Sequence, residues 1–509
     1  MERDVEKEAA DVQIRQHAVT PTPPREIPSP ARTASLDPSS ESSTTPSLLE
    51  KSLAANVASA DADEHGTPLL PAKRHRSRLA RYLDHNFFSY YRKTFTIVFA
   101  ANLIAFIVMV STQRSTRDLM TTVQIAVSAN LMVALLFRQE NFVNLWYEIF
   151  TSVPHGLPLW LRTRCAKVFH YGGAHSGCGV AAVTWHLLYT ALATKEFVET
   201  RQNDARSSVI TSWILVTMFL AMVIAAHPRL RVRYHDRFEY THRFAGWAAL
   251  ATFWTHLILN AAADGRAKGL SLGMDLVQSV NFWFLLVSTG CSVLSWARLR
   301  RRTVTPERLS DHAIRLHFGY MPMKPFYGLK VSNRPLLEWH AFATIPDTDE
   351  QGGTKGFSVV VSNAGDWTKN TIQHQPQKLW VRGYPMHGLL YTSKLFKRII
   401  VVATGSGIGP TLSLMKANIT PRRILWSTPH PETTYGPTIM KTVLEADPNA
   451  VIWNTRTQGR PDMVTMTYRL FREYDAEAVF IISNPKLTRK VVYGMESRGI
   501  AAYGAIFDS

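Results

Sequence analysis

Six apolar stretches in the first 300 residues constrain this chain more than any other feature. Each has the length that an α-helix needs to cross a bilayer, roughly 20 residues. They lie near Thr94–Thr112, Leu119–Phe137, Ala174–Thr194, Ser207–Ala226, His242–Ala263 and Leu276–Trp296. The third and fifth carry histidines and many small residues, which is typical of helices inside a bundle. The sequence therefore predicts a six-helix transmembrane domain.

Basic residues between these stretches predict the side of the membrane on which each loop lies. Lys and Arg are dense after the second, fourth and sixth stretches and sparser after the first, third and fifth. Because cytosolic loops carry the excess of Lys and Arg, the dense loops and both termini should be cytosolic. We therefore expect an integral, multi-pass protein of the plasma membrane or an endomembrane, with membrane lipid as a partner.

The basic charge could also indicate nucleic acid. The formal net charge is +18, but runs such as KRHRSRLAR and RLRRR stand beside apolar stretches, where the orientation rule places them. No nucleic-acid motif is present, so we expect no nucleic-acid partner. The three cysteines, Cys165, Cys178 and Cys291, form no C-x-x-C pair, which argues against a disulfide framework or a cysteine zinc site.

The two ends of the predicted membrane region differ in character from it. Residues 1–75 are rich in Pro, Ser, Thr, Ala and acids and lack apolar periodicity, so they should form a disordered tail. The first residues, MERDVEKEAADVQ, are too polar for a cleavable signal peptide. A basic, aromatic segment from Lys73 to Lys93 then suits a membrane interface and leads into the transmembrane domain, residues 76–302.

Residues 303–509 alternate short β-like runs with turns and then strands with helices. The runs AIRLHFG, LKVSN, HAFATIP, FSVVVS and KLWVRG predict a small antiparallel barrel over residues 303–397. From residue 398, the runs IIVVAT, RILWST, AVIWNT and AVFIIS predict parallel strands of an open α/β sheet. The predicted fold class is therefore multi-domain: a helical bundle, a barrel and an α/β domain.

A glycine-rich turn follows the first of these parallel strands. The strand Ile399–Val402 leads into Gly405, Gly407, Gly409 and Pro410, and TLSLMKANI can form the next helix. Glycine allows a close backbone approach, and a helix N-terminus supplies free N–H groups and a positive dipole. This arrangement is suited to a pyrophosphate, although a glycine turn alone is often only a turn.

Four segments occur in a set order in this part of the chain. They are Trp339-His340-Ala341-Phe342, Gly365-Asp366-Trp367-Thr368, the glycine turn, and Thr457-Gln458-Gly459-Arg460-Pro461-Asp462. With the helical region before them, they resemble the ferric reductase and NADPH oxidase superfamily, and most closely its fungal membrane flavoproteins of the TmpA type. The resemblance covers about residues 90–509 and implies a ferredoxin-reductase-type module that binds FAD and NADPH.

The resemblance also implies roles for individual residues. His340 and Phe342 would lie at the flavin, with Gly365, Asp366, Trp367 and Thr368 around FAD and its phosphates. The pyridine nucleotide would face Gly405, Gly407, Gly409 and Pro410. Arg460 could meet the 2′-phosphate of NADPH, with Arg422 and Arg423 as alternatives. Phe507, or else Tyr503, would cover the isoalloxazine ring as the family's C-terminal aromatic does.

Two departures from the family pattern bear on activity. The family's H-P-F-T is His340-Ala341-Phe342-Ala343 here, so the threonine hydroxyl is missing, although Thr344 is adjacent. The family's cysteine near the hydride-transfer site is replaced by Ser483. Because hydride passes directly between the two cofactors, this loss favours altered efficiency over inactivity.

Membrane histidines provide candidate haem ligands. His242 and His256 stand fourteen residues apart and so lie on nearly one helix face, whereas His175 and His186 are eleven apart. By topology, His170 or His175 with His242 would form an inner site, and His186 with His256 an outer one. A hydrogen-bonded structural histidine explains each residue about as well, so two haems, one or none stay open.

The sequence thus predicts a membrane flavoprotein oxidoreductase. It would move electrons from NADPH through FAD to haem or directly to a small-molecule acceptor. The alternative is a degenerate, reductase-like membrane protein with a redox-sensing or regulatory role, which the altered flavin motif and the missing cysteine motivate.

Overall fold

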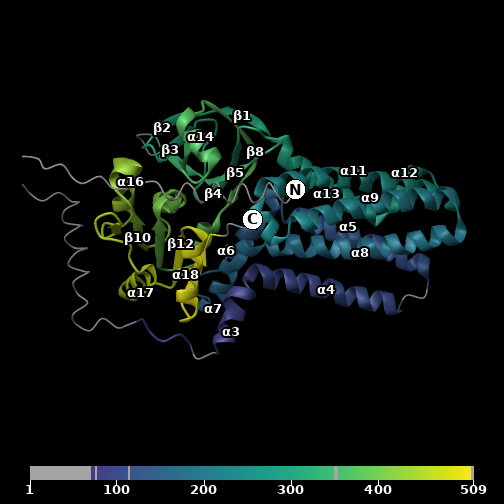
Figure 1. The fold of residues 1–509 in the computed structure, drawn as a ribbon, viewed down its shortest axis with the longest axis horizontal. Coiled ribbons are helices and arrows are strands. Elements are labelled where there is room, and N and C mark those ends of the chain that lie inside the picture. Colours follow the sequence, from purple (N-terminus) through teal and green to yellow (C-terminus); the bar gives the residue numbers. More distant parts are fainter. Residues whose placement is uncertain (1–69, 75–76, 113–114, 349–352, 506–509) are drawn as a thin grey trace, which may run out of the picture. The chain divides into compact units, whose positions relative to one another are not determined.

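The computed structural model describes residues 70–74, 77–112, 115–348 and 353–505. Most of the predicted tail and the predicted flavin-covering residue Phe507 lie outside the described residues. The described part divides into a helical region followed by two sheet-containing regions (Figure 1).

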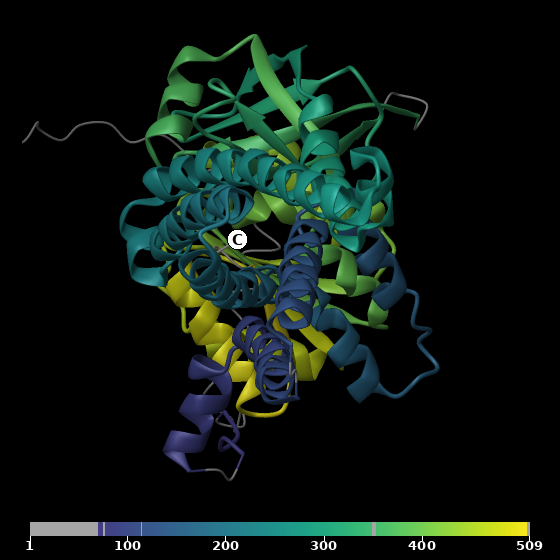
Figure 2. The ribbon, with the colours of Figure 1, turned by 90° about the vertical axis from the view of Figure 1, so that its right-hand side faces the viewer.

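Long helices form the first region and run side by side (Figure 1). They are α4 Tyr90–Thr112, α5 Thr116–Leu136, α8 Gly172–Thr200, α9 Asn203–Ala225, α11 His235–Lys268 and α13 Val280–Ala297. Helix α8 packs against α4, α5 and α9, while α9 also contacts α11 and α5 contacts α13. Figure 2 views these helices nearly end-on. The first five predicted apolar stretches therefore each lie in one helix, and α8 and α11 extend well beyond their predicted ends. The sixth, Leu276–Trp296, is divided at Ser279 between α12 Leu272–Gln278 and α13.

Only part of the predicted membrane-crossing pattern follows from helix length and composition. Among the described helices, α4, α5, α9 and α13 are long and apolar enough to cross a membrane. Helices α8 and α11 carry more polar residues than these four helices. Helix α8 also buries a larger fraction of its side chains inside the protein than α11 does. It stays a prediction that α8 and α11 also cross the membrane and that the bundle therefore spans it six times.

Shorter helices connect and precede the long ones. They are α3 Arg78–Tyr82, the π-helix η2 Leu83–Phe87, α6 Glu140–Thr151, α7 Leu159–Cys165, the 3-10 helix η3 Ala166–His170, α10 Pro228–Arg233 and α12 Leu272–Gln278. We call residues 137–171 the linking segment, because α6, α7 and η3 connect α5 to α8. Its helices were not predicted from the sequence.

The predicted antiparallel barrel is present as two four-stranded sheets around one core. The strands are β1 Arg300–Thr303, β2 Thr305–Arg308, β3 Ala313–Phe318, β4 Tyr327–Ser332, β5 His340–Ala343, β6 Ile345–Thr348, β7 Thr354–Ser362 and β8 Lys378–His387. Their orders are β1-β8-β4-β5 and β2-β3-β7-β6. Alternating residues such as Leu316, Val359 and Val381 point inward and are buried together. Helix α14, Asp366–His374, follows β7 and buries Trp367 and Ile372 in this core.

The predicted parallel sheet is also present. Its order is β11-β10-β9-β12-β13, and all neighbouring strands are parallel. The strands are β9 Ile399–Thr404, β10 Arg422–Thr428, β11 Val451–Asn454, β12 Ala478–Ile482 and β13 Ala501–Gly504. The connecting elements are η4 Leu389–Leu395, η5 Gly405–Gly407, α15 Ile408–Ala417, α16 Pro431–Ala446, α17 Met463–Glu473 and α18 Pro485–Glu496. The central strand β9 is apolar on both faces because helices cover both sides of such a sheet.

A buried ion pair joins the linking segment to this sheet. Arg162 of α7 is 3% exposed and donates two hydrogen bonds to Glu477, at 2.8 and 2.9 Å. It also donates to the Leu395 carbonyl at 2.7 Å and the Leu157 carbonyl at 3.0 Å. The hydrogen bonds from Arg162 lower the pKa of Glu477 below its ordinary value, while those to Glu477 raise the pKa of Arg162. Glu477 precedes β12, so the pair fixes α7 against the amino end of the sheet.

Removing one charge of this pair should destabilise the fold strongly. Glu477→Gln leaves Arg162 buried without its counter-charge, and such a loss costs about 3–5 kcal/mol. Thermal unfolding should show the corresponding fall in Tm. Glu473→Gln is the matched control, because Glu473 forms a partly exposed i,i+4 pair with Arg469, worth about 0.5 kcal/mol or less. Equal Tm values for the two variants would contradict the account.

A second ion-pair network lies in the barrel and contains a titratable histidine. His317 of β3 lies 2.8 Å from Asp347 and 2.9 Å from Glu307. Its hydrogen bond to Asp347, with a further one to Glu307, raises the pKa of His317 above its ordinary value. Its contribution to stability is therefore complete below the unfolded-state pKa and is lost as the pH rises through the folded-state pKa.

The pH dependence of a variant tests this network. We expect His317→Gln to lower the Tm at pH 6 and to lower it less as the pH is raised to 9, because the wild-type imidazole loses its charge as the pH rises through its folded-state pKa. A Tm difference that is the same at both pH values would show that the charged form of His317 has no role.

Candidate functional site

The glycine turn lies where β9 ends and α15 begins. Gly405 adopts a left-handed conformation, with φ +51°, that favours glycine. A Cβ on Gly407 would collide with the Ile482 carbonyl of β12, so only glycine allows the turn to pack so closely. No side chain caps η5 or α15, and the N–H of Ile408, the first residue of α15, bonds back to the Gly405 carbonyl. The uncapped backbone N–H groups at this turn are therefore those of Gly405–Gly407 in η5, and such groups suit an anionic ligand.

The position of this turn in the sheet supports a ligand site. The chain goes from β9 to β10 and β11 on one side, then crosses to β12 on the other. In open α/β sheets, ligands bind outside the carboxyl ends of the strands at such a switch point. Ser483, directly after β12, hydrogen-bonds Thr404 at the end of β9. Ser483 therefore lies beside the glycine turn.

The arginine alternatives fall at different edges of the sheet. Arg460 follows β11 at the carboxyl edge and is exposed, in a turn closed by a hydrogen bond from Trp453 to the Gly459 carbonyl, 2.9 Å. Arg422 begins β10 at the opposite edge and binds the Leu414 and Met415 carbonyls, both at 3.1 Å. It therefore caps the C-terminus of α15. Arg423 is ion-paired with Asp447. Of the three arginines, the geometry favours Arg460 for a nucleotide phosphate.

The predicted flavin residues come together on the barrel. The rings of His340 and Trp367 stack with centroids 4.2 Å apart, and Phe342 lies 5.7 Å from Trp367. The indole nitrogen of Trp367 is buried and has no hydrogen-bond partner within the described residues. Burial lowers the pKa of His340, against the charge of Glu338 at 3.5 Å. The stacked pair leaves no gap for a flavin ring between them, so a flavin would have to lie beside the pair.

The Gly365–Thr368 element forms the N-terminal turn of α14. The Thr368 hydroxyl accepts hydrogen bonds from the Ala364 and Gly365 amides, at 2.9 and 3.0 Å. It also donates to the Gly365 carbonyl at 2.8 Å. Its side chain therefore shapes the turn. Asp366 is exposed beside it, and Thr344 donates to the Tyr327 carbonyl at 2.9 Å. Thr344 therefore does not replace the missing threonine hydroxyl.

The unpaired indole nitrogen and the open turn fit a ligand rich in acceptor oxygens. A flavin nucleotide is such a ligand, since its ring carbonyls and phosphates accept hydrogen bonds. His340, Phe342 and Trp367 would provide the aromatic contacts, and the α14 N-terminus would face its phosphates.

The predicted inner histidine pair meets within the bundle. His175 and His242 have ring centroids 6.0 Å apart. His175 Nδ1 lies 2.8 Å from the Ala134 carbonyl, so its Nε2 stays available, as in metal-bound histidines. Two imidazoles on one metal, with bonds of roughly 2 Å, have a similar separation. His170 instead stacks on Tyr90, so His175 is the candidate inner ligand.

The predicted outer pair is engaged in hydrogen bonds. His256 uses Nδ1 toward Thr211 at 2.7 Å and Nε2 toward Asn260 at 3.0 Å. His186 Nε2 lies 3.2 Å from the Ser212 carbonyl. These bonds occupy both nitrogens of His256 and the Nε2 of His186. The outer pair is therefore hydrogen-bonded as structural histidines are, and haem binding at either pair stays a prediction.

One cluster that the sequence did not reveal connects the linking segment to the barrel. Glu148 of α6 accepts a hydrogen bond from the Tyr391 hydroxyl at 2.7 Å and lies 3.0 Å from His387 Nε2. Lys394 donates to the same hydroxyl at 2.8 Å. Despite partial burial, Tyr391 and His387 lower the pKa of Glu148. Only the amphipathic pattern of ENFVNLWYEIFT could have indicated this contact.

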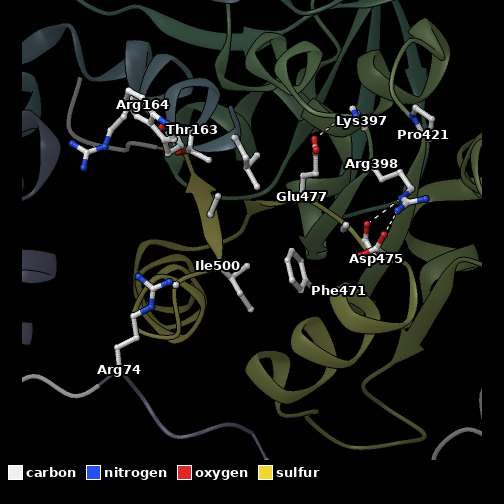
Figure 3. A pocket seen from close by; sticks show the side chains of 15 residues that line it. Arg74, Thr163, Arg164, Lys397, Arg398, Pro421, Phe471, Asp475, Glu477 and Ile500 are labelled. Atoms are coloured by element: carbon white, nitrogen blue, oxygen red, sulfur yellow. Dashed lines mark hydrogen bonds and ion pairs between the residues drawn. The ribbon is translucent and has the colours of Figure 1, made fainter. Parts of the chain in front are cut away.

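Tyr503, the second candidate for covering the flavin ring, is fully buried. It stacks on Phe480 and donates to the Thr163 carbonyl at 3.0 Å. It thus packs the linking segment against β13 and does not face a cofactor site. A large pocket of about 1110 Å³ lies nearby, at the amino edge of the sheet (Figure 3). It is lined by Trp160, Lys397, Phe471 and Ile500 among others, opposite the glycine turn.

Known proteins resemble this chain along most of its length. Residues 389–509 match a family model described as the C-terminal domain of Adenylate-forming reductase 03009. The chain is 45% identical over 435 residues to Adenylate-forming reductase 03009 of Coprinopsis cinerea, and 43% identical over 436 residues to Adenylate-forming reductase 06235 of that fungus. Each match covers 85% of this chain and 42% of the relative. The chain thus spans less than half the length of these curated relatives.

Both matches are longer than the 303–509 region, so the similarity extends into the helical part of this chain. The relatives are named as reductases, which agrees with the reductase prediction at that level. The closer resemblance to ferric reductases stays a prediction.

Solved structures give weaker likenesses. A flavohemoglobin from Malassezia yamatoensis is 12% identical, with a TM-score of 0.36 over 76% of this chain and 98% of its own. A ferredoxin NADP+ reductase from Neisseria gonorrhoeae is 13% identical, with a TM-score of 0.33 over 41% of this chain and 98% of its own. At these scores the likeness adds nothing to what the strand order itself shows.

Gly407→Ala tests the close packing of the glycine turn. The new methyl group meets the β12 backbone, and such overpacking costs about 1–3 kcal/mol. We expect a lower Tm and a smaller Tm increase on adding NADP+. Gly319→Ala is the control, because a Cβ there meets nothing within 4 Å. A variant that keeps both the wild-type Tm and the wild-type response would contradict this geometry.

Proposed function

We propose that this chain is a membrane-anchored, NADPH-dependent flavoprotein reductase, or the electron-transfer part of a longer one. The observation that carries the proposal is the glycine turn of β9, at the switch point of a parallel sheet and beside Ser483. The reductase names of the relatives, which cover most of this chain, agree with it.

The residues of the chain would bind and orient the two cofactors. Backbone N–H groups at Gly405–Gly407 would hold the NADPH pyrophosphate, and Arg460 its 2′-phosphate. His340, Phe342 and Trp367 would contact FAD. When bound, NADPH supplies a hydride, and the flavin accepts it and passes the two electrons on singly. Ser483 and Thr404 would hold the carboxyl ends of β12 and β9 together beside the transfer point.

The helical bundle would anchor the module, with both termini in the cytosol. Electrons would leave the flavin for a small acceptor at the cytosolic face, such as ferric ion, oxygen, a quinone-like molecule or a lipophilic metabolite. A single haem between His175 and His242 is a second route, which their 6.0 Å ring separation favours over an outer site.

The visible spectrum of the purified protein tests this proposal. In detergent, we expect a flavin absorption band that NADPH bleaches in the absence of oxygen. A Soret band would add the haem route, and His242→Ala should then abolish it. A colourless protein that neither binds FAD nor oxidises NADPH would overturn the proposal.

One observation favours a second candidate, a regulatory protein that binds nucleotide without turnover. The His340–Trp367 stack closes the space between two predicted flavin contacts, and Ala343 lacks the hydroxyl of the family motif. Such a protein would change its Tm with NADPH yet show no flavin band. The spectrum and the thermal shift together separate the two candidates.

Arg460→Ala tests the choice of coenzyme. Hydrogen bonds to charged groups contribute about 1.5–3 kcal/mol, so the KM for NADPH should rise about ten- to hundredfold. The KM for NADH should stay unchanged, because NADH has no 2′-phosphate. Arg472→Ala, at the exposed C-terminal end of α17, is the control. An equal rise of the KM for NADPH and for NADH would contradict the assignment of Arg460 to the 2′-phosphate.

A further inference from the structure

Helix α6 presents two opposite faces. One face is docked: Val143 and Tyr147 are buried, and Asn144 donates to the Pro385 carbonyl at 2.9 Å. The other face carries Leu145, 56% exposed, and Ile149, 54% exposed. A helix with an apolar outer face of this kind marks an interaction surface.

Aromatic residues border this outer face. Phe142, Trp146 and Phe150 follow one another at four-residue steps and are half-buried. The rings of Trp146 and Phe150 lie 4.8 Å apart. Further along the linking segment, Trp160 of α7 is 67% exposed. Trp, Phe and Leu on one face are typical of helices that lie in a membrane interface.

The chain itself limits how far α6 can lie from the bundle. Helix α5 is long and apolar enough to cross a membrane, and it ends at Leu136. Helix α6 begins at Glu140. Four residue steps span at most about 14 Å when fully extended, so α6 starts within that distance of the end of α5.

The charges around the outer face suit a lipid surface. The linking segment has two acidic residues, Glu140 and Glu148. Glu140 is buried and accepts a hydrogen bond from Ser295, while Glu148 is bonded to Tyr391. Arg138 and the exposed Arg164 remain as the flanking charges, and they would be attracted to anionic headgroups.

We propose that the outer face of α6 lies in the cytosolic leaflet, with Leu145 and Ile149 at the boundary between headgroups and acyl chains. This placement rests on the membrane anchoring in the proposed function. Because the inner face of α6 holds β8 and η4, the helix would fix the distance between the reductase module and the bilayer. It would therefore support the module at the interface together with α13, which also contacts β8.

Fluorescence quenching in lipid nanodiscs tests the placement. Ile149→Cys would carry an NBD label in discs of phosphatidylcholine and phosphatidylserine with doxyl groups at acyl carbon 5 or 12. The native cysteines Cys165, Cys178 and Cys291 are buried, and the unsubstituted protein measures their background. Asn370→Cys on α14 is the water control, and Ile104→Cys on α4 is the lipid control.

The expected result is loss of emission at position 149 with 5-doxyl lipid, less loss with 12-doxyl lipid, and protection from iodide. This follows from a depth of about 5–10 Å for an interfacial helix. Quenching by iodide but not by the doxyl lipids would show that this face of α6 lies in water. Protection from iodide and from the doxyl lipids would show that protein covers this face. Either outcome overturns the proposal. If position 104 is not quenched by either lipid, the membrane anchoring itself fails.

Discussion

The ion pair between Arg162 and Glu477 is the interaction that holds the linking segment against the parallel sheet. A buried arginine is tolerated only when its N–H groups are satisfied, and here Glu477 and two backbone carbonyls satisfy them. Lys167 adds a second bond of this kind to Glu496, at 2.6 Å. The linking segment is thus fixed to the amino edge of the parallel sheet, while its ends continue into α5 and α8.

The two edges of the parallel sheet therefore differ: the amino edge holds the linking segment, and the carboxyl edge carries the candidate site. The linking segment bonds to Leu395 in η4 before β9, to Glu477 directly before β12, and to Tyr503 within β13. The carboxyl ends carry the glycine turn, Ser483 and the turn with Arg460. A nucleotide at these ends would bind at the edge of the sheet opposite this attachment. The large pocket of Figure 3 belongs to the attached edge, and its size alone does not make it the nucleotide site.

Local patterns predicted much of this fold, and long-range packing decided the rest. The runs IIVVAT and AIRLHFG form β9 and β3 with nearly the predicted bounds, because buried strands carry their signal in consecutive residues. The glycine turn was predicted because its signal also lies in neighbouring residues. The stacking of His340 on Trp367 was not predicted, because it joins residues far apart in sequence. The role of Arg422 was not predicted either, because its side chain donates to carbonyls at the C-terminus of α15. Helix α6 was missed because its apolar residues form a stripe too short to resemble a membrane span.

Hydrogen–deuterium exchange with and without NADPH tests the central claim that the nucleotide binds at the carboxyl edge of the sheet. The account predicts slower exchange in peptides that contain Gly405–Thr411 and Ser483, and unchanged exchange around Lys397 and Arg398 at the amino edge. Protection at Lys397 and Arg398, with none at the glycine turn, would contradict it and move the site to the pocket beside the linking segment.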